Sequence, residues 1–142
     1  AALLYLLFSL AFVVTFAGWR GWPPAGSLML WMIAIAMLML ISIAIAILLV
    51  GLTLNLRLAL SMTGLYVATG LAFSGFSYPR AAMAPAAQAW GSILPYTHYL
   101  PLQQGQWLGG ASASAWAQGM MPFMLFIIIP LLIGLPLLSR AV

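Results

Sequence analysis

Few side chains in this sequence are able to carry acid–base or metal chemistry. The 142 residues include one histidine, His98, and no aspartate, glutamate or cysteine. A metal site needs several such ligands, and a catalytic histidine needs a carboxylate or a nucleophile beside it. We therefore expect no catalytic residue and no bound metal in this chain. His98 is expected to be a hydrogen-bonded residue at the membrane interface; a place in a substrate path or gate is the alternative.

A serine turn at residues 74–77 is the second chemical candidate. Its sequence, Ser-Gly-Phe-Ser, lacks the full Gly-x-Ser-x-Gly pattern of a hydrolase nucleophile, and the chain has no acidic residue to orient a base. The proton relays of secondary transporters also rely on acidic residues inside the membrane. The sequence thus argues against an enzyme, and against a proton-driven carrier that uses only this chain.

The four basic residues are arginines scattered along the sequence: Arg20, Arg57, Arg80 and Arg140. Nucleic-acid binding requires clustered lysine and arginine, so the formal charge of +4 does not indicate a nucleic-acid partner. Arg80 directly follows Pro79, and we expect its long side chain to extend to the lipid headgroups.

Composition identifies the elements that must position these residues. Hydrophobic residues make up 66% of the chain and charged residues 3%, whereas soluble domains carry roughly a quarter charged residues. The mean hydropathy is +1.20. Four apolar stretches, residues 1–18, 27–50, 58–76 and 115–138, are long enough to cross a bilayer as helices. We predict an all-α integral membrane protein with about four transmembrane helices, forming a single domain over residues 1–142.

The connection between the third and fourth spans, residues 77–114, is long and apolar. Its apolar pieces are too short to cross a membrane, and prolines at positions 79, 85, 95 and 101 interrupt it. This pattern predicts short re-entrant helices, which enter the membrane and leave it on the same side. The fourth span contains Pro122, Pro130 and Pro136, which membrane helices tolerate when neighbouring groups satisfy the freed carbonyls.

The number of spans places the first and third connections on one side of the membrane and the tight turn at residues 52–57 on the other. Arginines divide equally between the two sides, so the positive-inside rule gives no orientation. The aromatic residues are asymmetric, because eight of the eleven Trp and Tyr residues lie in or beside the first and third connections. That side is predicted to be rich in interfacial anchors. These eight are Trp19, Trp22, Tyr78, Trp90, Tyr96, Tyr99, Trp107 and Trp116.

Small residues recur every fourth position in the third span, at Gly64, Ala68 and Ala72. This spacing puts them on one helix face and allows another helix to approach closely. We expect packing within this chain in preference to a dedicated dimer seam.

An ordered set of short motifs covers residues 75–100. It runs Gly-Phe-Ser-Tyr-Pro at 75–79, Met-Ala-Pro at 83–85, Gln-Ala-Trp at 88–90 and Leu-Pro-Tyr-Thr-His-Tyr-Leu at 94–100. In this order the motifs resemble the signature of type-2 ABC exporter permeases, the bacterial multidrug and drug-efflux branch. Ala84 is a one-residue departure, since that family places Met and Pro side by side. The span pattern extends the resemblance to nearly the whole chain.

The resemblance implies that the chain is the carboxy-terminal part of a six-span permease, in the bacterial inner membrane. It implies a cytoplasmic turn containing Asn55 and Arg57, and an external gate in the re-entrant segment. It also implies a second permease half, a separate ATPase that binds ATP and Mg²⁺, and a periplasmic adaptor protein. The chain itself has no P-loop. A channel or secondary carrier without ATP coupling and a non-transport assembly subunit remain as alternatives. The expected gate residues are Gly75, Tyr78, Pro79, Met83, Pro85, Pro95, Thr97, His98 and Tyr99.

Overall fold

The structure, a computed structural model, describes residues 2–139, and these residues form helices joined by short loops. In chain order the elements are α1 (Ala2–Arg20), α2 (Leu28–Thr53), α3 (Leu56–Phe73), the 3-10 turn η1 (Arg80–Ala82), α4 (Pro85–Ser92), α5 (Pro95–Trp107) and α6 (Ala113–Ser139). Four helices, α1, α2, α3 and α6, are long and apolar enough to cross a bilayer. The predicted all-α membrane fold with four spans is therefore confirmed.

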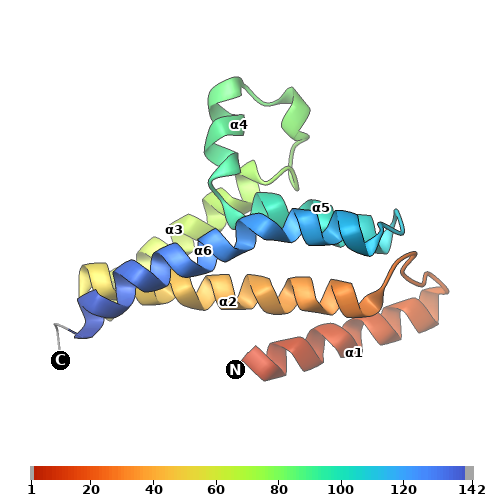
Figure 1. Cartoon of the computed structure of the whole chain (residues 1–142), viewed down its shortest axis with the longest axis horizontal. Coiled ribbons are helices and arrows are strands. Elements are labelled where there is room, and N and C mark those ends of the chain that lie inside the picture. The colour runs from red at the N-terminus through yellow and green to blue at the C-terminus, as the bar shows by residue number, and fades with distance from the viewer. Residues whose placement is uncertain (1, 140–142) are drawn as a thin grey trace.

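Helices α2 and α6 lie side by side at the centre of the molecule and run in the same direction (Figure 1). They contain 26 and 27 residues, or about 40 Å at roughly 1.5 Å per residue, which is enough to cross the bilayer with some tilt. Their contact is completed by α5, because Leu102 joins Ile41, Met120 and Phe123 in one buried cluster. This cluster forms the core that holds the re-entrant segment.

The first and third connections meet at one end of the molecule, as the span count predicts. The backbone N–H groups of Ala25 and Gly26 donate to the carbonyls of Trp107 and Gln106, at 3.0 and 2.8 Å. At the opposite end, α2 runs directly into α3 through Leu54 and Asn55 alone. Leu54 adopts a left-handed φ of 47°, and the Asn55 side chain accepts from two backbone N–H groups at the start of α3. The predicted turn at 52–57 is therefore shorter than expected.

The third span ends at Phe73, so the prediction that it continues to Phe76 is wrong. Gly75 has a φ of +96°, a conformation that a right-handed helix cannot contain and that glycine adopts readily. The Ser74 hydroxyl donates to the Leu71 carbonyl and accepts from the Phe76 N–H. These bonds fold residues 74–76 into a turn that leads away from α3.

The predicted short helices between the third and fourth spans are present as α4 and α5. Figure 1 shows α5 lying along α2 and α6, whereas α4 projects away from the body. Pro85 and Pro95 begin these helices, a position where the missing N–H costs nothing. Pro101 was expected to interrupt the segment, but α5 continues through it. Proline removes only one interior hydrogen bond, and packing of α5 on α2 and α6 offsets this loss.

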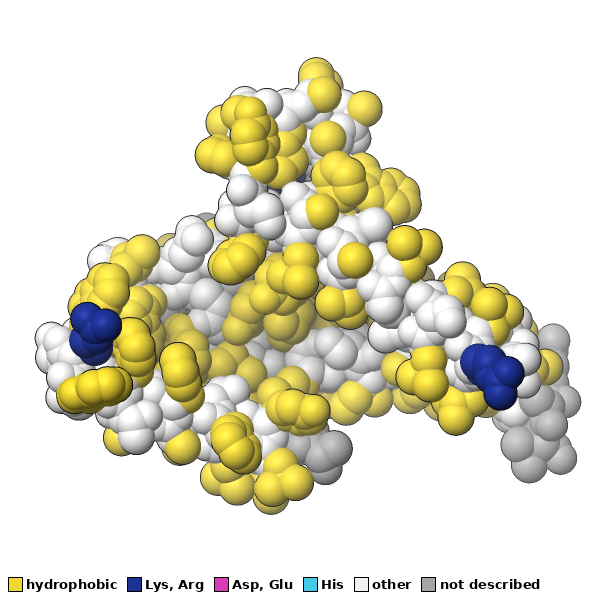
Figure 2. Space-filling model, turned by 180° about the vertical axis from the view of Figure 1, so that it is seen from behind, with side chains coloured by type: hydrophobic (Ala, Val, Ile, Leu, Met, Phe, Trp, Pro, Cys, Tyr) yellow, Lys and Arg dark blue, Asp and Glu magenta, His cyan; other side chains and the backbone are white. Residues whose placement is uncertain are grey.

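The many exposed apolar side chains are those expected of a protein surface that contacts lipid. Figure 2 shows apolar side chains over most of one face, with basic side chains only near the two ends of the long axis. Phe8 is 77% exposed and Leu65 69% exposed, exposures that are favourable for large apolar side chains in lipid.

The small-residue face of α3 does not pack within this chain, contrary to our expectation. Gly64, Ala68 and Ala72 are exposed, and a Cβ added to Gly64 would meet no atom within 4 Å. The side of α3 that faces the body carries Ala59 and Gly70 instead, both of which are buried. Residue spacing shows which residues of α3 share a face of small side chains, but it does not show what that face contacts.

Candidate functional site

The elbow between α4 and α5 is held by two side chains of α5. The Thr97 hydroxyl donates to the carbonyl of Gly91 at 2.6 Å, and Nε2 of His98 donates to the carbonyl of Ser92 at 2.8 Å. The last carbonyls of a helix have no partner within that helix, so these two bonds satisfy the end of α4. Because Pro95 starts α5 directly after this end, its first turn carries both donors back to α4.

The hydrogen bond to Ser92 determines which ring nitrogen of His98 carries hydrogen. A carbonyl oxygen only accepts, so Nε2 must carry hydrogen, and this fixes the tautomer of the neutral ring. The imidazole also lies 5.6 Å from the ring of Phe126, between centroids. Both residues line a groove of about 430 Å³ between the elbow and α6. His98 is thus hydrogen-bonded and also borders a groove.

A glycine contact fixes α4 against the end of α3. A Cβ added to Gly91 would lie 2.7 Å from the carbonyl oxygen of Phe73, which no side chain can tolerate without displacing a helix. On the other side of the elbow, Tyr96 and Tyr99 contact each other with centroids 5.6 Å apart, and Tyr99 packs against the core cluster. The elbow is therefore joined to both α3 and the centre of the molecule.

The structure separates the nine predicted gate residues into two groups. Pro95, Thr97, His98 and Tyr99 lie together in the first turns of α5. The other five lie before or at the start of α4, and they are Gly75, Tyr78, Pro79, Met83 and Pro85. Within this second group the Tyr78 side chain is 54% exposed, while the Met83 carbonyl accepts from the Gln88 amide at 2.9 Å. The first group is buried or half-buried, and the second lies before or at the start of α4, with Gly75 close enough to α5 to line a pocket with Thr97.

A residue that the sequence analysis did not single out, Gln106, is the most buried polar group near the site. Its side chain is 0% exposed. Its Oε1 accepts from the Ser27 N–H at 2.8 Å, and its Nε2 donates to the Ala111 carbonyl at 3.0 Å. Gln106 thereby joins the first connection, α5 and the third connection. The available signal was a cluster of three of the five glutamines of the chain, at positions 103, 104 and 106.

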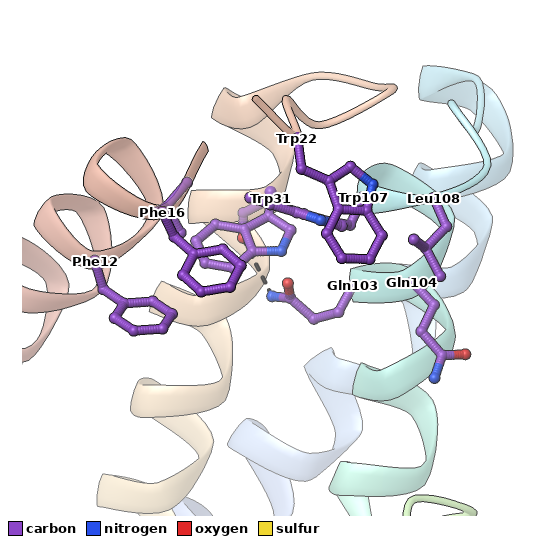
Figure 3. A pocket seen from close by; sticks show the side chains of 9 residues that line it. Phe12, Phe16, Trp22, Trp31, Gln103, Gln104, Trp107 and Leu108 are labelled. Carbon is purple, nitrogen blue, oxygen red and sulfur yellow. Dashed lines mark hydrogen bonds between the residues drawn. The ribbon is translucent and has the colours of Figure 1, made fainter. Parts of the chain in front are cut away.

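An aromatic groove lies beside this junction, between α1, α2 and α5. It encloses about 360 Å³, and its lining includes Phe12 and Phe16 of α1, Trp31 of α2 and Trp107 of α5. Figure 3 shows these rings and that of Trp22 around the groove, with the amide of Gln103 directed toward Trp31. The rings of Trp31 and Trp107 are 5.8 Å apart and tilted by 52°. Such a surface suits an apolar or aromatic ligand.

Comparisons with known proteins found no match to this chain among protein-family models, curated proteins or solved structures. The chemistry of the site therefore has to be argued from the residues themselves. Among residues 2–139 no three His, Cys, Asp or Glu side chains gather as a metal site would require. The two grooves are lined mainly by apolar side chains, which suit apolar ligands.

Proposed function

We propose that this chain is the transmembrane permease subunit of an ATP-driven ABC-type exporter in the bacterial inner membrane. It would move drugs, lipids or other amphiphilic substrates across that membrane. ATP and Mg²⁺ would bind to a partner ATPase, and a second permease half would complete the pore. A periplasmic adaptor protein is a further expected partner.

The observation that carries this proposal is the α4–α5 elbow between the third and fourth spans. Its residues coincide with the ordered motifs at 75–100 that resemble type-2 ABC exporter permeases. Proline-started helices that do not cross the bilayer are tolerated at membrane depth only against protein or a water-filled cavity. Helix α5 has such a protein surface on α2 and α6, whereas α4 projects away from it. The projecting helix is therefore the part that a second permease half would cover.

In the proposed mechanism, closure of the ATPase subunits rocks two permease halves against each other. The two α4 helices lie at the dimer axis and act as the external gate. Thr97 and His98 of α5 are hydrogen-bonded to the end of α4. Movement of α5 together with α2 and α6 would therefore carry α4 with it. Substrate would leave between the two halves when the gate opens.

Cross-linking α4 to α4 tests the gate. The sequence contains no cysteine, so Ala89→Cys, at an exposed position of α4, places a single thiol there. In assembled transporter, joining two copies through this thiol is expected to abolish export while ATP binding by the partner persists. Phe8→Cys, on the exposed face of α1, is the matched control and should leave export intact. Full export by the cross-linked Ala89→Cys protein would contradict the gate.

Co-purification distinguishes the exporter from the alternatives. An exporter subunit is expected to isolate with an ATPase whose activity rises when an amphiphilic substrate is added. A channel or secondary carrier would conduct substrate in vesicles without ATP, and an assembly subunit would conduct none. ATP-independent flux through the purified chain would therefore reject the proposed function.

Replacing His98 by alanine is expected to reduce transport less than replacing Pro95 and Tyr99 together. The single change removes one hydrogen bond, worth about 0.5–1.5 kcal/mol, whereas the double change alters both the start of α5 and its packing on the core. Transport rates of the two variants at equal expression provide the measurement. Complete loss with His98→Ala alone would instead give this side chain a direct part in the substrate path.

A further inference from the structure

The Arg80 side chain does not extend away from the protein but folds back over the turn that follows α3. Gly75 makes this possible, because a Cβ at that position would lie 3.0 Å from Cγ of Arg80. One guanidinium nitrogen, Nη2, donates to the Gln88 carbonyl at 3.3 Å. A second, Nε, is buried and has no hydrogen-bond partner. The cation is thus partly buried, and one of its donors has no partner.

Arg80 borders a small polar pocket between this turn and α5. The pocket encloses about 190 Å³, and its lining includes Ser74, Thr97, Pro101 and Gln104 besides Arg80. A water molecule takes about 30 Å³ of liquid, so the space suits a small ionic group with a few waters. Its polar lining, besides Arg80, comes from Ser74, Thr97 and Gln104, and none of these side chains carries a negative charge.

The sequence offers this cation no counter-charge, because it contains neither aspartate nor glutamate. A partly buried charge without a partner is costly, and an external anion would remove that cost. Arginine presents a planar fork of N–H donors that matches the oxygens of carboxylate and phosphate groups. The uncompensated charge and the polar lining therefore favour an anionic oxygen ligand over a neutral one.

We propose that the Arg80 pocket binds a small anionic oxygen group, a phosphate or a carboxylate. The anion pairs with the guanidinium, and the amide of Gln104 is a second donor within the lining. Gln104 also lines the aromatic groove, so the two spaces adjoin along α5. A lipid headgroup and a free anion share this chemistry. The inference concerns binding alone and does not depend on the proposed transport function.

The experiment measures the thermal unfolding midpoint of the purified chain in an uncharged detergent. Phosphatidylglycerol, phosphatidylcholine and inorganic phosphate are titrated separately, and an apparent affinity follows from the midpoint shift. We compare wild type with Arg80→Gln and, as the matched control, with Arg57→Gln at the exposed start of α3. Wild type and the control should respond equally, and Arg80→Gln should bind at least tenfold more weakly.

The probes separate the two sources of the anion. A response to phosphatidylglycerol but not to inorganic phosphate assigns a headgroup, and a response to inorganic phosphate assigns a free anion. If Arg80→Gln fails to fold, Arg80→Lys retains the charge without the planar fork and should weaken binding at least threefold. Equal affinity in wild type and the folded Arg80 variant, or no response of wild type to either anionic probe, would overturn the proposal.

Discussion

Replacing Gln106 with leucine is expected to destabilise the protein severely. The change removes both side-chain bonds of the fully buried Gln106 and leaves the Ser27 N–H and the Ala111 carbonyl, which are part-buried, without that partner. A lost hydrogen bond costs about 0.5–1.5 kcal/mol, and about 1–3 kcal/mol where the group left behind is out of reach of water. Folded proteins are stable by only about 5–15 kcal/mol, so losing both bonds removes a large share of that stability.

Thermal unfolding in detergent measures this effect, and Gln104→Leu provides the matched control. Gln104 is exposed and lies two residues away in the same helix, so the same substitution there buries no unsatisfied group. A lower midpoint for Gln106→Leu alone is the expected result. Proteolysis of the first connection should also accelerate, because Gln106 holds Ser27 at its end. Equal midpoints for the two variants would show that the junction contributes no net stability.

Much of the fold follows from the sequence because the bilayer imposes a length on apolar segments. Four long apolar stretches predict four spans, and the proline-broken stretch between the third and fourth predicts short helices. The end of the third span was not predictable in this way. The apolar stretch continues to Phe76, whereas the backbone turns at Gly75, where φ is positive. Hydropathy contains no information on backbone conformation.

The candidate site was predictable only in part, because several of its contacts join residues that are far apart in the sequence. Thr97 and His98 lie in the proline-broken segment that the motifs indicate, although their acceptors on α4 emerge only from the elbow geometry. The role of Gln106 was not predictable, because its side chain bonds to Ser27, which is 79 residues away in the sequence. Long cations usually extend away from the protein, whereas the Arg80 side chain folds back over Gly75, a contact that residue spacing alone does not predict.

The second large effect is expected at Gly134, where α6 crosses α2. A Cβ added there would lie 2.8 Å from Cα of Leu48 and 2.9 Å from its backbone nitrogen. Backbone atoms cannot rotate aside as a side chain can, so Gly134→Ala must push the two longest helices apart. Overpacking of this kind costs about 1–3 kcal/mol. The unfolding midpoint of Gly134→Ala is therefore expected to fall.

Gly64→Ala is the control that makes this result interpretable. Alanine stabilises a helix interior relative to glycine by about 1 kcal/mol, a gain available at both positions. At Gly64 nothing lies within 4 Å of the added methyl group, so only that gain applies and the midpoint should hold or rise. At Gly134 the steric cost must exceed the same gain for the midpoint to fall. A fall at both positions would instead show that the exposed face of α3 contacts another molecule under the conditions of measurement.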